Sequence, residues 1–153
     1  MAKAIYLEDL SVGTRFESAE YEMTAEAIIA FAREFDPQPF HTDPNAAGDS
    51  FFQGLAASGW HTASVTMRLL VDAVPLAQGV IGASGTIAWP TPTRAGDLLR
   101  VVASVEDIAQ SRSKPGRAMV AMRCETRNQH GELRQEFSPN VIAWSRTVDP
   151  EAG

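Results

Sequence analysis

Hydrophobic positions early in the chain follow the spacing of one helix face. The apolar residues between Thr24 and Asp36 recur at i, i+3, i+4 and i+7: Ile28, Phe31, Ala32 and Phe35. Thr24 is a good N-cap, and Glu26 favours the helix dipole. Pro37 restricts the residue before it, so we expect the helix to end near Asp36 and a rigid loop to cover residues 36–41.

A second, longer helix is predicted from Ser58 to the residue before Pro75. One stripe of this helix is apolar along its whole length: Trp60, Ala63, Met67, Leu70, Val71 and Val74. Val65 and Leu69 add apolar surface on another side. Because a helix that is apolar nearly all round must be covered, we expect other elements of the chain to wrap around it.

Alternating and β-branched positions dominate the rest of the chain and predict strands. The expected strands cover residues 15–23, 80–89, 98–106, 117–127 and 132–146. Turn signals separate the last four: Gly96-Asp97, Lys114-Pro115-Gly116 and Asn128-Gln129-His130-Gly131. This order predicts an α+β fold in which four strands form an antiparallel meander and the curved sheet wraps around the long helix.

The composition indicates one ordinary globular domain. A length of 153 residues supports one core, which we expect at residues 1–148 with a flexible tail at 149–153. A signal-peptide core and an apolar span of about 20 residues are both missing, so we expect a cytoplasmic protein. The net charge of -6 argues against nucleic acid and membrane as partners. Cys124, the only cysteine, is expected to be a buried apolar residue, without a disulfide or a thiolate metal site.

The segment after the first helix carries a carboxylate and an imidazole five residues apart, Asp36 and His41. Two such groups can form an acid/base pair, provided that they are held within about 0.5 Å of productive geometry. Pro37 and Pro39 supply that rigidity. A turn aspartate and a surface histidine explain the same spacing. His41 and Asp43 lack the further ligands of a metal site, and none is expected.

Ser58 and Gly59 open the long helix, where backbone N–H groups lack partners within the helix. These groups can stabilise developing negative charge, and a glycine lets a carbonyl oxygen approach closely. Simple capping of the helix explains the same residues. The pattern by itself is therefore compatible with either role.

Together these features resemble a known family. The run from Phe35 to His61, FDPQPFHTDPNAAGDSFFQGLAASGWH, is similar to the MaoC-like dehydratases and R-specific enoyl-CoA hydratases. Their site consists of an Asp, a His five residues later and a Gly eighteen residues further on, which match Asp36, His41 and Gly59. The segments IAWPTPTRAGDLLRVVASV and ETRNQHGEL also look like this family, so the resemblance covers nearly the whole chain. It implies a hot-dog fold.

The resemblance further implies reversible hydration of a trans-2-enoyl-CoA, or a related acyl thioester, to the 3-hydroxyacyl-CoA. The thioester oxygen is expected at the Gly59 N–H and a water between Asp36 and His41. Asp36 is the favoured base and His41 the orienting partner and acid, although coupled groups leave the reverse assignment open. Coenzyme A enters as part of the substrate, and no other cofactor is required. Many relatives have Asn in place of Gln38 and some have Ser in place of Met67, which leaves the acyl group open.

Further substrate contacts are expected at Gln38, Ser58, Trp60, Arg94, Arg112, Lys114 and Arg117. The basic residues among them suit the phosphates of coenzyme A, although a basic hairpin is also a common solvated surface.

The two other histidines are not expected to act in catalysis. His61 is expected to be packed or partly exposed, and His130 to face solvent.

Uncovered sheet edges and the family resemblance both predict a homodimer or a higher homo-oligomer, and the resemblance implies a substrate tunnel between subunits.

Two other functions remain open. A hot-dog acyl-CoA thioesterase usually has a carboxylate on the central helix, where this chain offers only the distant Asp72. A non-catalytic acyl-CoA-binding or structural subunit would be expected to lose Asp36 or His41, and this chain retains both.

Overall fold

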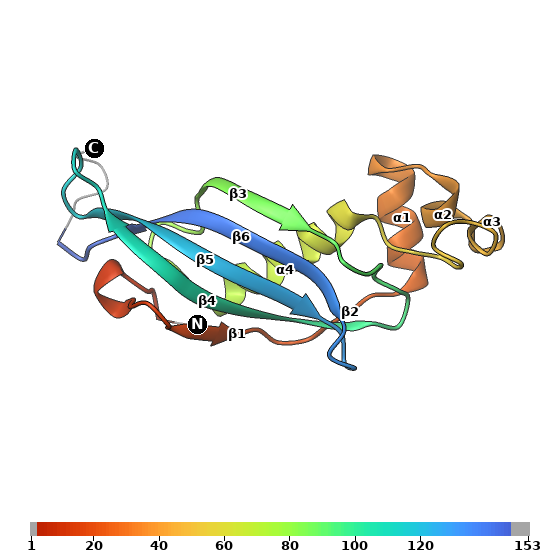
Figure 1. Cartoon of the computed structure of the whole chain (residues 1–153), viewed down its shortest axis with the longest axis horizontal. Helices are drawn as coiled ribbons and strands as arrows, with labels where there is room; N and C mark the ends of the chain where they lie inside the picture. Colours follow the sequence, from red (N-terminus) through yellow and green to blue (C-terminus); the bar gives the residue numbers. More distant parts are fainter. Residues whose placement is uncertain (1–2, 148–153) are drawn as a thin grey trace.

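A computed structural model describes residues 3–147. In chain order the elements are η1 (Leu7–Asp9), β1 (Arg15–Glu17), β2 (Tyr21–Glu22), α1 (Ala25–Phe35), α2 (Pro39–Thr42), α3 (Pro44–Ala47), α4 (Gly59–Ala73), β3 (Gly82–Ala88), β4 (Leu98–Gln110), β5 (Arg117–Arg127) and β6 (Leu133–Trp144). The curved sheet packs one face against α4, and α1 to α3 gather at one end of the molecule (Figure 1). This α+β arrangement is the expected hot-dog fold. The tail predicted at 149–153 lies outside the described residues.

The strand order departs from the predicted meander. The six-stranded antiparallel sheet runs β1-β4-β5-β6-β3, with β2 beside β4, so only β4, β5 and β6 are consecutive neighbours. β3 pairs with β6 at the opposite edge from β1, and Gly96-Asp97 therefore does not close a β3–β4 hairpin. Residues 89–97 instead cross at the start of α4, where the Ala57 N–H donates to the Thr93 carbonyl at 2.9 Å. The local sequence pattern that predicts turns does not indicate where such a crossing segment lies in the fold.

The helix α4 is covered on one side only, whereas the sequence predicted that it would be covered nearly all round. Its buried residues are His61, Thr62, Val65, Thr66, Leu69 and Leu70. Trp60, Met67 and Val71, which the apolar stripe placed in the core, are 60%, 38% and 45% exposed. The prediction that the helix is covered nearly all round is thus wrong within a single protomer, because the sheet covers only one side of α4. The opposite side presents apolar surface.

The helix α1 forms where predicted, and the segment after it is more regular than predicted. The Thr24 hydroxyl caps α1 by accepting a hydrogen bond from the Ala27 N–H at 3.1 Å. Asp36 is the C-cap of α1, as the proline pattern required. Residues 39–42 form the short helix α2 rather than a loop, because Pro39 suits the first position of a helix and begins a new turn. His41 thereby lies on a helical turn and is buried.

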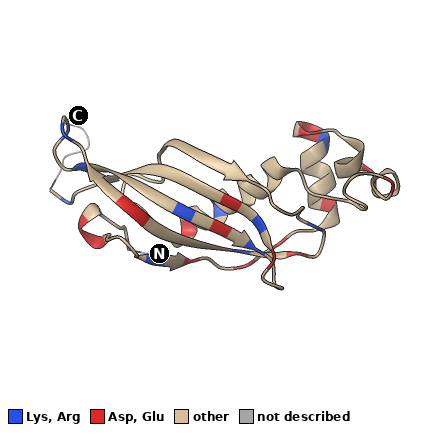
Figure 2. Ribbon diagram, viewed as in Figure 1, with Lys and Arg blue, Asp and Glu red and all other residues tan. Residues whose placement is uncertain are grey.

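The charged residues lie mainly on the outer face of β4 to β6 and around α1, whereas β3 carries none (Figure 2). Cross-strand pairs such as Arg123 with Glu136, at 3.0 Å, cover the sheet surface. Cys124 is fully buried on the inner face, and burial raises the pKa of its thiol to about 12. None of the helices within residues 3–147 has the length and apolar character needed to cross a bilayer.

Candidate active site

Asp36 and His41 lie side by side at the end of the molecule where α1 meets α2. The Asp36 Oδ2 atom is 3.3 Å from the His41 Nε2 atom, and the two side chains are only 18% and 5% exposed. The C-cap position directs Asp36 back toward α2, and the single turn from Pro39 brings His41 to face it. The structure therefore brings the two predicted acid/base residues into direct contact.

The contacts of His41 determine which of its nitrogens can exchange a proton. Its Nδ1 atom is 2.6 Å from the carbonyl oxygen of Ala56. A carbonyl only accepts hydrogen bonds, so Nδ1 must carry a proton and donate it. Nε2, the nitrogen that faces Asp36, is then free to gain or lose a proton. Edge-to-face packing of Phe40 against the imidazole, at 4.6 Å between centroids, further fixes the ring.

Asp36 is held as a carboxylate by its neighbours. Burial raises the pKa of Asp36, but hydrogen bonds from the side chains of Gln38 and Ser58 and the charge of His41 outweigh it, and the pKa is lowered overall. The Gln38 Nε2 atom donates to Asp36 Oδ1 at 2.5 Å. Gln38 and Ser58, predicted as substrate contacts, thus contact the acid/base pair in this structure. Ser58 also caps α4, where its hydroxyl accepts from the Trp60 N–H at 3.3 Å.

A cavity of about 340 Å³ opens beside this pair and is lined by His41, Gly59 and the crossing segment, residues 89–93. Gly59 is the first residue of α4, and among the described residues its N–H donates to no acceptor. A Cβ atom at this position would lie 2.6 Å from the Trp89 ring, so the close packing of Trp89 requires glycine. The cavity wall thus contains His41 of the acid/base pair and a free N–H at a helix N-terminus, while Asp36 contacts His41 from outside this lining.

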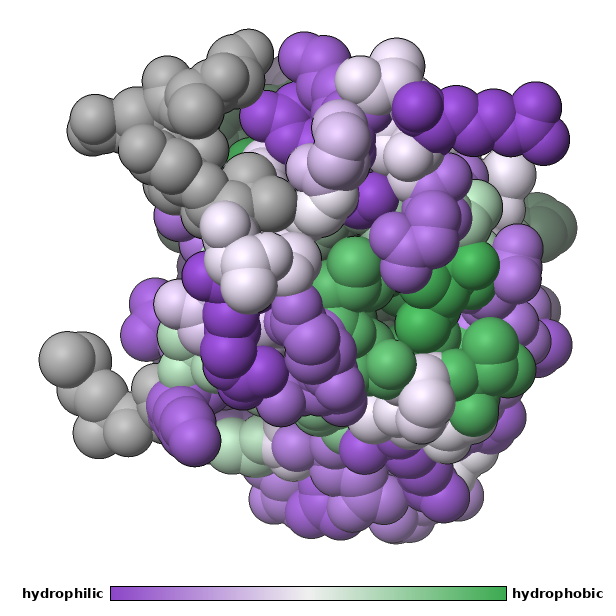
Figure 3. Space-filling model, turned by 90° about the vertical axis from the view of Figure 1, so that its left-hand side faces the viewer, coloured by the Kyte–Doolittle hydropathy of each residue, from purple (hydrophilic) through white to green (hydrophobic). Residues whose placement is uncertain are grey.

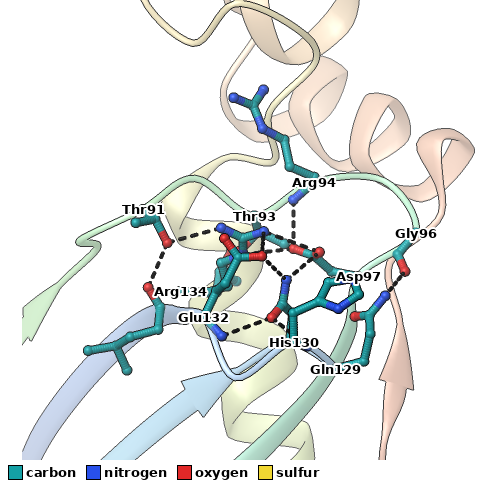
Figure 4. A network of polar contacts seen from close by, with 12 residues as sticks. Thr91, Thr93, Arg94, Gly96, Asp97, Gln129, His130, Glu132 and Arg134 are labelled. Carbon is teal, nitrogen blue, oxygen red and sulfur yellow. Dashed lines mark hydrogen bonds and ion pairs between the residues drawn. The ribbon is translucent and has the colours of Figure 1, made fainter.

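Arg134, in the wall of the cavity, forms a buried ion pair with Asp97 (Figure 4). Arg134, which lines the cavity, donates from Nε to Asp97 Oδ2 at 2.9 Å and from a terminal nitrogen to the Thr91 hydroxyl at 3.0 Å. Burial raises the pKa of Asp97, but the hydrogen bonds from Arg134, the Arg94 N–H and Asn128 outweigh it and lower the pKa overall. These contacts hold the crossing segment in place. Sequence reasoning assigned no role to Arg134, because the pair is 37 residues apart and no local pattern joins them.

Comparison with known proteins shows the family to which this fold belongs. Residues 9–126 match the family described as MaoC like domain. The chain belongs to the MaoC-like domain family. The crystal structure of a MaoC-like dehydratase from Rhodospirillum rubrum superposes with a TM-score of 0.93 at 53% identity, covering 95% of this chain and 100% of that one.

Two curated relatives are more distant. A 3-hydroxybutyryl-CoA dehydratase from Methylorubrum extorquens is 28% identical over 123 residues, which cover 80% of this chain and 75% of that protein. An uncharacterised protein of Bacillus subtilis is 32% identical over 66 residues, 43% of this chain. That second match spans 47% of the Bacillus protein, less than half of its length.

The remaining predicted substrate contacts of this MaoC-like domain lie outside the cavity. Arg94 donates to the carbonyl oxygens of Gly54 and Leu55, at 3.0 and 3.2 Å, and to that of Phe52, so it fixes the loop before α4. Trp60 is 60% exposed on the uncovered side of α4. The basic residues Arg112, Lys114 and Arg117 belong to the β4–β5 hairpin, at the far end of the sheet from α1 and α2 (Figure 1). A single protomer does not bring this hairpin to the acid/base pair.

The other histidines do not join the pair. His61 is buried on α4, where its ring stacks on Phe31 at 4.6 Å and burial lowers its pKa. This agrees with the prediction of a packed residue. His130 is exposed in the β5–β6 turn, as predicted.

Proposed function

We propose that this protein is a hydro-lyase that reversibly adds water to a trans-2-enoyl-CoA, or a related acyl thioester, to give the 3-hydroxyacyl-CoA. The observation that carries the proposal is the contact of Asp36 with His41, at 3.3 Å, beside a cavity that the N-terminus of α4 also enters. Hydration needs a group to deprotonate water, a group to protonate the α-carbon and a donor for the thioester oxygen. The Methylorubrum relative, named as a 3-hydroxybutyryl-CoA dehydratase, supports the same reaction class.

In this mechanism a water molecule lies between the two side chains. Asp36, whose lowered pKa keeps it ionised, removes a proton from the water as its oxygen attacks the β-carbon. His41, held by the Ala56 carbonyl, gives a proton from Nε2 to the α-carbon on the same face. The proton on Asp36 then passes to Nε2 across the 3.3 Å contact, which restores both groups. The reverse assignment of base and acid stays open because the two groups are in contact and can exchange a proton.

The thioester oxygen becomes more negative as water adds to the β-carbon. The Gly59 N–H at the start of α4 is the proposed donor to this oxygen, and the dipole of the 15-residue helix favours the same charge. One such donor is commonly worth about 3 kcal/mol in the barrier. Coenzyme A enters with the substrate, and the mechanism uses no further cofactor. The predicted contact of the basic hairpin with coenzyme A phosphates stays a prediction, as does the cytoplasmic location.

A homodimer is the proposed assembly. β3 is an edge strand that pairs only with β6, six of its seven residues are exposed, and it carries no charge. Long uncharged edges with unpaired N–H and C=O groups are sites of pairing between chains. Met67 and Val71 are exposed on the side of α4 that the sheet leaves uncovered, and Met67 lies next to β3. Figure 3 shows a further hydrophobic area at the hairpin end of the molecule. A second copy can cover these surfaces.

The alternative functions make different predictions about the same site. A thioesterase would release free thiol from the acyl-CoA, and Asp72, the carboxylate on α4, is exposed and paired with Arg68 at 3.6 Å instead of facing the cavity. A binding subunit would show affinity for acyl-CoA without turnover. The retained Asp36–His41 contact favours the hydro-lyase over both.

The decisive experiment follows the loss of the enoyl-thioester absorbance with crotonyl-CoA and longer trans-2-enoyl-CoAs. We expect turnover by the wild type and a fall of about a hundredfold or more in Asp36→Asn and in His41→Ala. Asp49→Asn and His130→Ala are matched controls, because both residues are exposed and lie outside the cavity. Circular dichroism checks that each variant is folded. Release of free thiol without hydration would replace the proposal by a thioesterase.

A further inference from the structure

The interior between α4 and the sheet is unexpectedly polar near the cavity. Five polar side chains there are each at most 2% exposed: Thr62, Thr66, Thr93, Thr126 and Gln135. Four of them satisfy one another, since Thr62 donates to the Thr93 hydroxyl at 2.9 Å and the Thr66 and Thr126 hydroxyls lie 2.7 Å apart. Buried polar groups are favourable only when they are paired, so the fifth requires a separate explanation.

Only one of the two polar atoms in the side-chain amide of Gln135, on β6, has a hydrogen-bond partner in the described part of the chain. Its Oε1 atom accepts a hydrogen bond from the Trp89 Nε1–H at 2.8 Å, which fixes the orientation of the amide. Its Nε2 atom is buried and has no hydrogen-bond partner among residues 3–147. A buried donor without a partner is costly, whereas a ligand oxygen that accepts from it removes that cost. The unpartnered N–H group of Gln135 is therefore available to a ligand oxygen that reaches it.

Gln135 also lines a groove of about 380 Å³ between α4 and β3. The remaining walls are formed by Ala63 and Met67 on α4, by residues 82–87, and by Phe137 and Pro139. None of the residues that line the groove is charged. The groove is thus an uncharged, mainly apolar passage whose wall contains one amide, that of Gln135, and the hydroxyl residues Ser84 and Thr86.

The groove adjoins the cavity that holds the acid/base pair. Trp89 lines that cavity and hydrogen-bonds to Gln135, and its ring contacts Trp60 of the groove edge-on, with 5.2 Å between centroids. A chain whose thioester oxygen lies at Gly59 can extend past Trp89 into the groove. We infer that this groove takes the acyl chain of the substrate, and that Gln135 selects chains carrying an uncharged oxygen, as a hydroxyl, carbonyl or ether, beyond the β-carbon. This inference rests on the proposed function.

The chemistry of the lining excludes two other classes of acyl group as preferred substrates. A plain hydrocarbon chain leaves the Gln135 Nε2–H unpaired, so it loses a hydrogen bond that the oxygenated chain gains. Within one protomer, a terminal carboxylate would enter a groove without a Lys or Arg to neutralise it. The preferred substrate is therefore an oxygenated but uncharged enoyl-CoA.

The test compares substrates of equal size. The value of kcat/KM is measured for 5-hydroxy-trans-2-pentenoyl-CoA against trans-2-hexenoyl-CoA, and for 6-hydroxy-trans-2-hexenoyl-CoA against trans-2-heptenoyl-CoA. In each pair a hydroxyl replaces a methyl group. We expect the wild type to prefer the hydroxylated member of at least one pair by about tenfold, the larger end of what one uncharged hydrogen bond provides. In Gln135→Met, which keeps the shape and loses the amide, the preference falls to within twofold.

The double variant Thr66→Val/Thr126→Val is the matched control, because it changes the same buried layer, removes both members of one hydroxyl pair and leaves Gln135 intact. Its preference should equal that of the wild type. Turnover of crotonyl-CoA with no preference in either pair, or a preference that survives in Gln135→Met, would overturn the inference while leaving the proposed function intact. Failure with every enoyl-CoA would overturn both.

Discussion

The packing of Trp89 on Gly59 makes the first residue of α4 sensitive to a single added methyl group. In Gly59→Ala the new Cβ atom would lie 2.6, 2.7 and 2.9 Å from three ring atoms of Trp89. Carbon atoms in contact normally stand about 3.5–4.0 Å apart. The ring or the helix must therefore shift by about 1 Å. Such a shift would stretch the 2.8 Å hydrogen bond between Trp89 and Gln135 past its useful range.

The expected cost follows from these two effects. Overpacking of this kind costs about 1–3 kcal/mol, and loss of the Trp89–Gln135 hydrogen bond adds about 1 kcal/mol. Alanine is intrinsically better than glycine in a helix by up to about 1 kcal/mol, which offsets part of this. Trp89 is 38% exposed and can relax toward solvent, which favours the lower end. We expect Gly59→Ala to lower the free energy of unfolding by about 1–3 kcal/mol.

A double-mutant cycle measures this coupling. Urea unfolding of the wild type, Gly59→Ala, Trp89→Leu and the double variant is compared at one fixed protein concentration, because assembly also contributes to stability. With Leu in place of Trp89 the clash disappears, so Gly59→Ala should then cost less than about 0.5 kcal/mol. An equal cost in both backgrounds would refute the reasoning, and so would a stabilised single variant.

Two further predictions concern the charged groups of the site. The pKa of Asp36 is lowered from its ordinary value of 3.8, so its carboxylate and the stability it contributes should persist as the pH falls until the lowered pKa is crossed. An NMR titration of this carboxyl should therefore show no transition above pH 3.8. A transition above about pH 5 would contradict the hydrogen-bonded environment assigned to Asp36. Within residues 3–147, Asp97→Asn leaves Glu132, at 3.7 Å, as the one carboxylate beside the buried Arg134, and should lower the free energy of unfolding by about 3 kcal/mol, the low end for a broken buried pair. Urea unfolding measures this loss, and a change below about 1 kcal/mol would show that the pair is dispensable for stability.

Local chemistry determined the ends of the helices and the acid/base residues. Thr24, Pro37 and Ser58 act on their immediate neighbours through caps and restricted backbone angles, so the bounds of α1 and the start of α4 could be predicted from them. The spacing from Asp36 to Gly59 also pointed to the site residues, whose contact the structure supplies. Pro39, however, was interpreted as stiffening a loop, although the same residue can begin a helix and does so here.

Tertiary packing decided the features that join distant parts of the chain. Sequence alternation gave the extent of β3, but it does not encode whether β3 pairs with β4 or with β6. The apolar stripe of α4 was equally ambiguous, because a helix with apolar residues on two sides does not reveal which side the sheet of its own chain will cover. The pairs Trp89–Gln135 and Asp97–Arg134 join residues 46 and 37 positions apart. Such contacts depend on where the crossing segment lies in space, so only the folded chain brings together the walls of the cavity and the groove.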